Sequence, residues 1–213
     1  MQINPDPNSP GASEKPVVVI TGATGFIGSA VIERLAHQYT LVALDREGPP
    51  DPPALAHRVD YDLGSDERVK AAFNKISARF GRRIASVLHF AAYYDVSGDP
   101  NPLYEQITVQ GTRRLLDALQ GFEVGQFVFA STMLVHKPTR QPGERISEAA
   151  PIEPAWAYPE SKVRTENLLR ERHGAIPLVL LRIAGVYDDL AHSPFIAEQV
   201  ARIYEHRLIA HMY

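Results

Sequence analysis

Residues 17–28 read VVVITGATGFIG, and this stretch is the strongest indication of the fold in the sequence. Its first four residues are continuously apolar, as in a strand that is buried on both faces of a parallel sheet. Gly22, Gly25 and Gly28 follow, and glycines at this spacing permit a sharp turn, a close backbone approach to a ligand and close packing of the next helix. A strand, a glycine turn and a helix in this order predict a cradle for a dinucleotide pyrophosphate. The alternative is a tight turn that holds no ligand; the spacing of a nucleotide triphosphatase loop is absent.

The remainder of the chain alternates short apolar runs with longer amphipathic ones. Further strands are expected at residues 41–44, 57–60, 84–89, 127–129 and 178–183. Ser65 is expected to cap a helix that ends at Gly81. Two longer helices are expected, one over residues 103–119 and one from Tyr158 to Gly174. Repeated strand–helix units with buried strands predict an α/β protein with a doubly wound parallel sheet, a Rossmann fold, whose ligands bind at the carboxyl ends of the strands.

The composition narrows the class of protein. The chain has 213 residues, enough for one well-cored α/β domain, and 45% hydrophobic with 22% charged residues is ordinary for a globular protein. A formal net charge of -3 argues against a nucleic-acid partner, and the lack of cysteine excludes disulfides, thiol catalysis and cysteine-ligated metals. No apolar run approaches membrane-spanning length, so no membrane association and a cytoplasmic location are expected. Residues 1–16 lack the pattern of a signal peptide and are expected to form a disordered tail.

The sequence YPESK at residues 158–162 places a phenol and an ammonium four residues apart on one helix face. A free phenol has a pKa near 10 and is a poor base at neutral pH. A nearby ammonium and the positive ring of an oxidised nicotinamide both favour the phenolate, so Lys162 is expected to lower the pKa of Tyr158 and to reach the nicotinamide ribose. Thr132, or its neighbour Ser131, can offer a hydroxyl to the substrate oxygen. These four side chains form the predicted catalytic set.

Asp45 ends the second expected strand, roughly twenty residues beyond the glycines, where a carboxylate can accept both ribose hydroxyls of a dinucleotide. Asp45 would repel a 2′-phosphate, which favours NAD over NADP. Arg46 beside it could instead accommodate that phosphate, so NADP stays open as an alternative. A solvated charged loop is the other interpretation of this pair. Asp62 and Leu63, after the third expected strand, could contact adenine.

His89 lies at the end of the expected strand that precedes Phe90. No second ligand stands at helical or hairpin spacing from it, so a metal role is not expected, and no metal site is predicted. A hydrogen-bonded core histidine beneath the cofactor is the favoured interpretation. A Ser-His-Asp triad is excluded because the G-x-S-x-G elbow is absent.

Together these motifs resemble the extended branch of the short-chain dehydrogenase/reductase superfamily, and are similar to its NAD-dependent epimerase/dehydratase group. The matching stretches are TGATGFIG at 21–28, Asp62-Leu63, HFAA at 89–92, Ser131-Thr132, YPESK at 158–162 and LRIAGVY at 181–187. The resemblance implies Tyr158 as acid/base, Lys162 as its partner and Thr132, more than Ser131, as the assisting hydroxyl. It also implies an NAD(P)-binding Rossmann domain over residues 17–190. The implied cofactor-binding residues are Gly22, Thr24, Gly25, Phe26, Ile27, Gly28, Asp45, Arg46, Asp62, Leu63, Ala91, Ala92, Tyr158 and Lys162.

Two features depart from the family's pattern. Thr108 stands where the family often has asparagine, which weakens any proton relay assigned to that position. The family's substrate-binding region lies largely beyond residue 213, so the substrate lobe is expected to be truncated and residues 191–213 to be only its start. The cofactor cleft is then expected to be nearly complete, with the substrate pocket open to water and little turnover.

The predicted function is that of an NAD(P)-dependent oxidoreductase, epimerase or dehydratase that moves a hydride and a proton at a hydroxyl or carbonyl of a small molecule, with a nucleotide sugar as one candidate. The alternatives are an NADP-dependent ketone or aldehyde reductase of the same superfamily and a catalytically silent dinucleotide-binding module. The family implies dimers formed through helices that match residues 102–119 and 158–173. Leu115, Leu116 and Leu119 give the first of these helices more apolar width than one sheet face requires, so a homodimer is expected.

Overall fold

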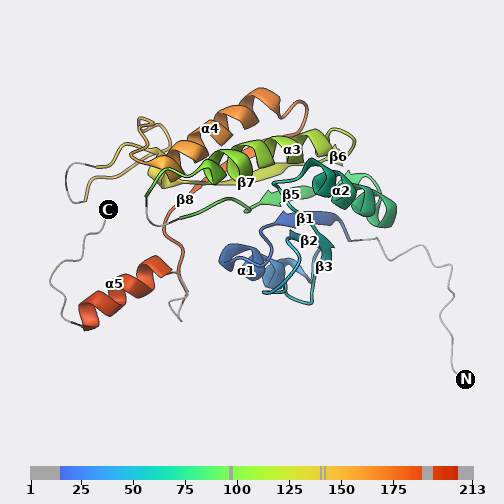
Figure 1. Cartoon of the computed structure of the whole chain (residues 1–213), viewed down its shortest axis with the longest axis horizontal. Coiled ribbons are helices and arrows are strands. Elements are labelled where there is room, and N and C mark those ends of the chain that lie inside the picture. Colours follow the sequence, from blue (N-terminus) through green and yellow to red (C-terminus); the bar gives the residue numbers. More distant parts are fainter. Residues whose placement is uncertain (1–14, 96–97, 140, 142, 189–193, 206–213) are drawn as a thin grey trace, which may run out of the picture.

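The computed structural model describes residues 15–95, 98–139, 141, 143–188 and 194–205 of the chain. Its main feature is a parallel sheet with helices on both faces (Figure 1). The strands run in the order β3-β2-β1-β5-β7-β8, and every pairing between neighbours is parallel. Their bounds are β1 (Val17–Thr21), β2 (Thr40–Asp45), β3 (His57–Asp60), β5 (Ser86–His89), β7 (Phe127–Thr132) and β8 (Leu178–Ile183). The predicted doubly wound α/β fold is confirmed.

The helices divide between the two faces of the sheet. In Figure 1, α2, α3 and α4 lie on one face, whereas α1 lies on the other, beneath β1 and β2. Their bounds, with two shorter helical segments, are α1 (Phe26–Leu35), α2 (Asp66–Phe80), η1 (Tyr104–Val109), α3 (Gln110–Leu119), η2 (Met133–Val135), α4 (Ala157–Arg172) and α5 (Pro194–Tyr204). The order of the strands reverses between β1 and β5, and in open α/β sheets ligands bind at such a switch point.

The alternation of strand side chains builds a separate core on each face. Phe127 and Phe129 of β7 pack with Leu115 of α3 and Leu169 of α4 in the larger cluster. Ile20 of β1 belongs to the smaller cluster under α1. The second face is incompletely covered toward β8, where Val179 and Leu181 keep 37% and 42% of their surface exposed.

Two predicted elements differ in detail. The strand expected at 84–89 is divided, because β4 (Arg83–Ile84) pairs with β6 (Glu123–Val124) in a separate two-stranded sheet, while β5 joins the main sheet. The helix expected at 103–119 begins with the π-helical segment η1 before it becomes α3. The ends of α2 are as predicted: the Ser65 hydroxyl accepts from the amide of Arg68, and Gly81 follows the last turn with a φ of 78°.

The leucines behind the homodimer prediction are core residues. Leu115, Leu116 and Leu119 are all 0–1% exposed, because α3 buries them against the sheet and its neighbouring helices. They therefore offer no apolar surface to a second protomer, and the sequence argument from them was wrong, although a homodimer itself stays a prediction.

Within the described residues, no helix is long and apolar enough to cross a membrane. The predicted tail lies outside the described part of the chain except for Lys15 and Pro16, and of residues 191–213 only α5 and Glu205 are described. The predicted domain limits therefore stay predictions.

Candidate active site

The glycine turn between β1 and α1 is packed so tightly that side chains are excluded from it. Gly22 has a φ of 67°, and a Cβ there would lie 2.8 Å from the amide nitrogen of Ala91. A Cβ at Gly28 would lie 2.2 Å from the carbonyl oxygen of Gly22. The N-terminus of α1, at Gly25, has no side-chain cap and no acidic residue in its first turn. A positive helix end with no acidic side chain in its first turn suits an anionic pyrophosphate, and the cradle itself stays a prediction.

Asp45 holds the same turn from the end of β2. Its Oδ2 accepts hydrogen bonds from the amide (2.9 Å) and the hydroxyl (2.7 Å) of Thr24, and its Oδ1 accepts from the Arg46 amide. A carboxylate offers about four lone-pair positions, so Asp45 retains the capacity to accept from a ribose. The Arg46 side chain is exposed, and Arg58 of β3 donates to the Arg46 carbonyl at 3.1 Å. Sequence reasoning missed this second guanidinium, because only the sheet brings residue 58 beside residue 46.

Asp62 and Leu63 make different kinds of contact. Asp62 accepts from the amide of Gly64 at 2.8 Å, whereas the Leu63 side chain is 5% exposed and packs in the main core. Leu63 lies so close to Gly111 of α3 that a Cβ on that glycine would approach it to 2.8 Å. The adenine contact predicted for the pair can therefore involve only Asp62 and the backbone of Leu63, because the leucine side chain is occupied.

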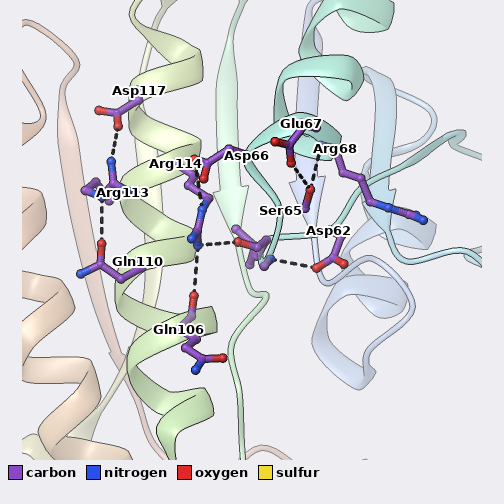
Figure 2. Close-up of polar contacts among 12 residues, drawn as sticks. Asp62, Ser65, Asp66, Glu67, Arg68, Gln106, Gln110, Arg113, Arg114 and Asp117 are labelled. Atoms are coloured by element: carbon purple, nitrogen blue, oxygen red, sulfur yellow. Dashed lines mark hydrogen bonds and ion pairs between the residues drawn. The ribbon is translucent and has the colours of Figure 1, made fainter.

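Arg114 of α3 fixes this loop, as Figure 2 shows. Its guanidinium donates to the carbonyl of Leu63 at 3.0 Å and to that of Gln106 in η1 at 3.2 Å. It also forms an ion pair with Asp66 at 3.2 Å. Arg114 therefore connects the start of α2 to the π-helical segment η1. No sequence motif predicted this role.

His89 is the buried core histidine that the sequence predicted. Its ring is 0% exposed and lies between the hydroxyls of Thr21 (2.6 Å) and Thr112 (2.9 Å). Burial, with a smaller contribution from the positive charge of Lys162, lowers the pKa of His89 to about 3. The Thr21 hydroxyl also accepts from the Ala91 amide at 3.2 Å, so His89 supports the strand end that crosses over Gly22.

Thr108, where the family often has asparagine, serves the backbone. Its hydroxyl accepts from the amide of Tyr93 at 3.0 Å, and its carbonyl accepts from the Thr112 hydroxyl at 2.6 Å. The residue therefore fixes the segment that follows β5, next to Tyr94.

Lys162 is buried at the carboxyl end of β7. Its side chain, 3% exposed, donates to the carbonyl of Ala130 at 2.7 Å. The ammonium lies 4.7 Å from the ring centroid of Phe129 and 5.6 Å from that of Tyr158. Burial lowers the pKa of Lys162 to about 7, against the opposing effect of the negative charge of Glu166.

Tyr158 is surrounded by other aromatic rings. The centroid of Tyr94 lies 4.9 Å away, that of Trp156 5.5 Å and that of Tyr104 6.4 Å. The pKa of Tyr158 is raised to about 12. Burial is the largest cause, and the nearby side chains of Tyr94 and Tyr104 add smaller contributions. The expected lowering of this pKa is therefore not produced by the protein residues, because desolvation of the phenol raises it.

The two candidate hydroxyls point to opposite sides of β7. Ser131 donates to Oε1 of the buried Glu166 at 2.5 Å. Thr132 accepts from the amide of Leu134 at 3.3 Å and caps η2. Because successive residues of a strand face opposite sides, the two hydroxyls have different surroundings, and that of Ser131 is hydrogen-bonded to Glu166. The described residues contain no group of three or more metal-ligating side chains.

Comparison with known proteins shows the family. Residues 18–210 match the model of the NAD dependent epimerase/dehydratase family, and the chain belongs to this family. It is 27% identical over 180 residues to the putative UDP-glucose 4-epimerase of Methanocaldococcus jannaschii, covering 81% of this chain and 57% of that protein. It is 31% identical over 175 residues to cinnamoyl-CoA reductase 1 of Oryza sativa subsp. japonica, covering 79% of this chain and 48% of that protein.

The fold is similar to that of enzymes whose structures have been solved. The crystal structure of the Bordetella bronchiseptica enzyme WbmG in complex with NAD aligns with a TM-score of 0.71 at 23% identity, over 92% of this chain and 62% of that chain. The chain thus spans about half to three fifths of the length of the proteins it matches. The predicted family and the NAD dependence of that family are confirmed, whereas the role of each site residue stays a prediction.

Proposed function

We propose that this chain supplies the NAD-binding and proton-transfer site of an enzyme that oxidises a hydroxyl of a nucleotide sugar transiently, in an epimerisation or dehydration. The family and the epimerase among the similar proteins support this proposal. The observation that carries it is the ammonium of Lys162, buried between the rings of Phe129 and Tyr158 at the carboxyl end of β7. Buried ionisable groups with shifted pKa values at a ligand-binding edge are typical of catalytic sites.

Each side chain has a distinct task in this proposal. When bound in the glycine cradle, NAD would supply the acceptor for the substrate hydride. Tyr158 takes the hydroxyl proton and later returns it, and the charged form of Lys162 stabilises the phenolate. The Thr132 hydroxyl orients the substrate oxygen. Because the Tyr158 pKa is about 12 in the protein alone, the base form depends on positive charge brought to the site.

The cofactor is proposed to be NAD rather than NADP. Asp45 already fixes Thr24 of the glycine turn, so its negative charge lies beside the ribose end of the cradle. A 2′-phosphate there would be repelled. The Asp45→Ala variant would narrow the affinity difference between the two cofactors.

The proposal is tested by titrating the chain with NAD and with NADP in a calorimeter, and then by incubating it with NAD and UDP-glucose and separating the sugar products. We expect tighter binding of NAD than of NADP. In the Tyr158→Phe variant we expect turnover to be lost while NAD affinity stays within about twofold, because only the ionisable oxygen is removed. Failure to bind either cofactor would refute the proposal, and binding without turnover would support the silent binding module for this chain.

A second candidate is a carbonyl reductase. The similarity to cinnamoyl-CoA reductase 1 favours it, as do the rings of Tyr94 and Trp156 beside Tyr158, against which an aromatic substrate could stack. Oxidation of NADPH or NADH in the presence of an aromatic carbonyl compound, without conversion of UDP-glucose, would favour this candidate over the first.

A further inference from the structure

Glu166 lies one helical turn beyond Lys162 on α4 and is 2% exposed. Its carboxylate accepts from the Ser131 hydroxyl at 2.5 Å. Arg182 of β8 donates to both of its oxygens, through Nε at 3.1 Å and a terminal nitrogen at 2.7 Å. Arg170 adds a further contact at 3.1 Å. Four donors from three elements therefore converge on one buried carboxylate.

The contacts keep this carboxylate charged. Burial alone would raise its pKa, but hydrogen bonds from Arg182 and Ser131, with the charges of Arg182 and Arg170, lower the pKa of Glu166 overall. A buried ion pair adds little net stability compared with apolar packing, so such a network is more informative about specificity than about stability.

Arg182 extends the network to the segment before α4. A terminal nitrogen of its guanidinium lies 3.2 Å from Nε2 of His136 and 3.3 Å from the carbonyl of Glu148. Nδ1 of His136 lies 3.0 Å from the carbonyl of Ala150, which identifies Nδ1 as the protonated nitrogen. The same cluster thus joins β7, β8 and the chain that leads into Tyr158.

We propose that Glu166 is a positioning residue of the site: it holds the Ser131 hydroxyl out of the cleft, fixes the strand end that carries Thr132, and supplies the negative charge nearest to Lys162 on the same helix. The proposal rests on the proposed function, since it concerns the same proton-transfer residues. Glu166 acts through its neighbours and touches neither substrate nor cofactor.

The effect of the Glu166 charge on Lys162 can be tested separately from its effect on the position of Ser131. Lys162 is faced by Glu166 and Tyr158 from α4 and by His89 from β5, and its ammonium also contacts Phe129. His89 is neutral near pH 7 because its pKa is about 3, and Tyr158 is protonated because its pKa is about 12. Of these groups, only Glu166 carries a negative charge at neutral pH.

The test uses the cofactor-free chain labelled with 13C at the lysine ε-carbon. The Lys162 signal, assigned by its loss in Lys162→Arg, is followed against pH. We expect Glu166→Gln to move its titration midpoint downward by roughly 0.5 to 1 pH. The matched control is Glu171→Gln, which removes an exposed carboxylate from the same helix and leaves the midpoint unchanged. A purely structural role would lower the melting temperature without moving this midpoint.

The positional part has its own readout. Amide hydrogen exchange at residues 131–134 is expected to accelerate at least about tenfold in Ser131→Ala and in Glu166→Gln, because both variants release the strand end. Ser131→Ala keeps the carboxylate, so it remains informative if Glu166→Gln does not fold. An unchanged Lys162 midpoint in folded Glu166→Gln, or unchanged exchange in Ser131→Ala, would overturn the proposal. Neither measurement needs NAD, so a failure of cofactor binding would count against the proposed function alone.

Discussion

At the scale of single residues, the pair at the end of β7 shows how strand geometry assigns chemistry. Ser131 and Thr132 are adjacent in sequence and equally able to donate a hydrogen bond. Their side chains lie on opposite sides of β7, and the Ser131 hydroxyl donates to Glu166. Thr132 as the assisting hydroxyl stays a prediction, and the hydrogen bond from Ser131 to Glu166, 35 residues further along the chain, favours it.

This assignment predicts unequal effects of two small substitutions. Thr132→Ala is expected to reduce turnover about a hundredfold, the usual effect of removing one hydrogen-bond donor to a reacting oxygen. Ser131→Ala is expected to reduce it less, since its hydroxyl acts through Glu166. Measuring the turnover number and the Michaelis constant of both variants would test this prediction. A larger loss of turnover in Ser131→Ala than in Thr132→Ala would contradict the assignment.

His89 predicts a dependence of stability on pH. In the unfolded chain the imidazole is protonated below its ordinary pKa of 6.5, whereas in the fold it stays neutral down to about pH 3. The unfolded state therefore binds more protons between these limits, and the free energy of unfolding falls as the pH falls through this window. Each pH unit well inside the window lowers it by about 1.4 kcal/mol through this residue.

Urea denaturation at pH 7, 5.5 and 4.5 would measure this effect. The His89→Gln variant keeps a donor and an acceptor for Thr21 and Thr112 but does not titrate, so its free energy of unfolding is expected to fall less steeply with acid. Equal slopes in the two proteins would show that the fold does not lower the pKa of His89.

At the scale of the element, the turn from β1 to α1 shows why glycine is required at particular positions. The carbonyl of Gly22 lies where a side chain at residue 28 would begin, and Ala91 lies over Gly22 itself. The turn is therefore shaped both by its own residues and by the strand end supported by His89 and Thr21.

The predicted consequence is a large loss of stability in Gly28→Ala. A Cβ at 2.2 Å from a backbone oxygen requires the turn to move, and overpacking of this kind costs about 3 kcal/mol. Gly185→Ala is the matched control, because nothing lies within 4 Å of a Cβ there. Chemical denaturation of both variants would compare them, and equal stability would mean that the turn relaxes freely.

At the scale of the whole molecule, the doubly wound sheet brings the glycine turn and Asp45 to the same edge as the Tyr158–Lys162 pair, which lies more than a hundred residues further along the sequence. Parallel pairing places the ends of β1, β2 and β7 on that edge. The helices opposite α1 present a polar outer surface: Figure 2 shows Arg113 of α3 between Gln110 and Asp117.

This polar outer surface changes the kind of interface that is expected for a homodimer. An interface through α3 and α4 would contact charged pairs such as Arg113–Asp117 and Arg164–Glu105 rather than leucines. We expect such a dimer to weaken as salt is raised, because exposed charges are screened. Sedimentation equilibrium at about 0.05 and 0.5 M salt would measure it, with a dimer insensitive to salt as the contrary result.

Most of the fold followed from the sequence, because its signals are local. The continuously apolar β1, the Ser65 cap and Gly81 stop of α2 and the amphipathic helices each depend on neighbouring residues. The divided strand at 84–89 was missed because β4 is set by its pairing with β6, a contact between distant residues. The π-helical segment before α3 likewise carries no periodicity that distinguishes it from an α-helix.

The sequence alone predicted the kinds of residue in the candidate site: the glycines of the cradle, an acidic residue at the end of β2, and a tyrosine and lysine on one helix face. These depend on spacing along one element. Their states come from tertiary packing: a Lys162 pKa near 7, a Tyr158 pKa near 12 and a Ser131 hydroxyl bonded to Glu166. Burial and the partners of a buried group come from packing between elements, and desolvation depends on every atom that excludes water, so no local pattern could fix them.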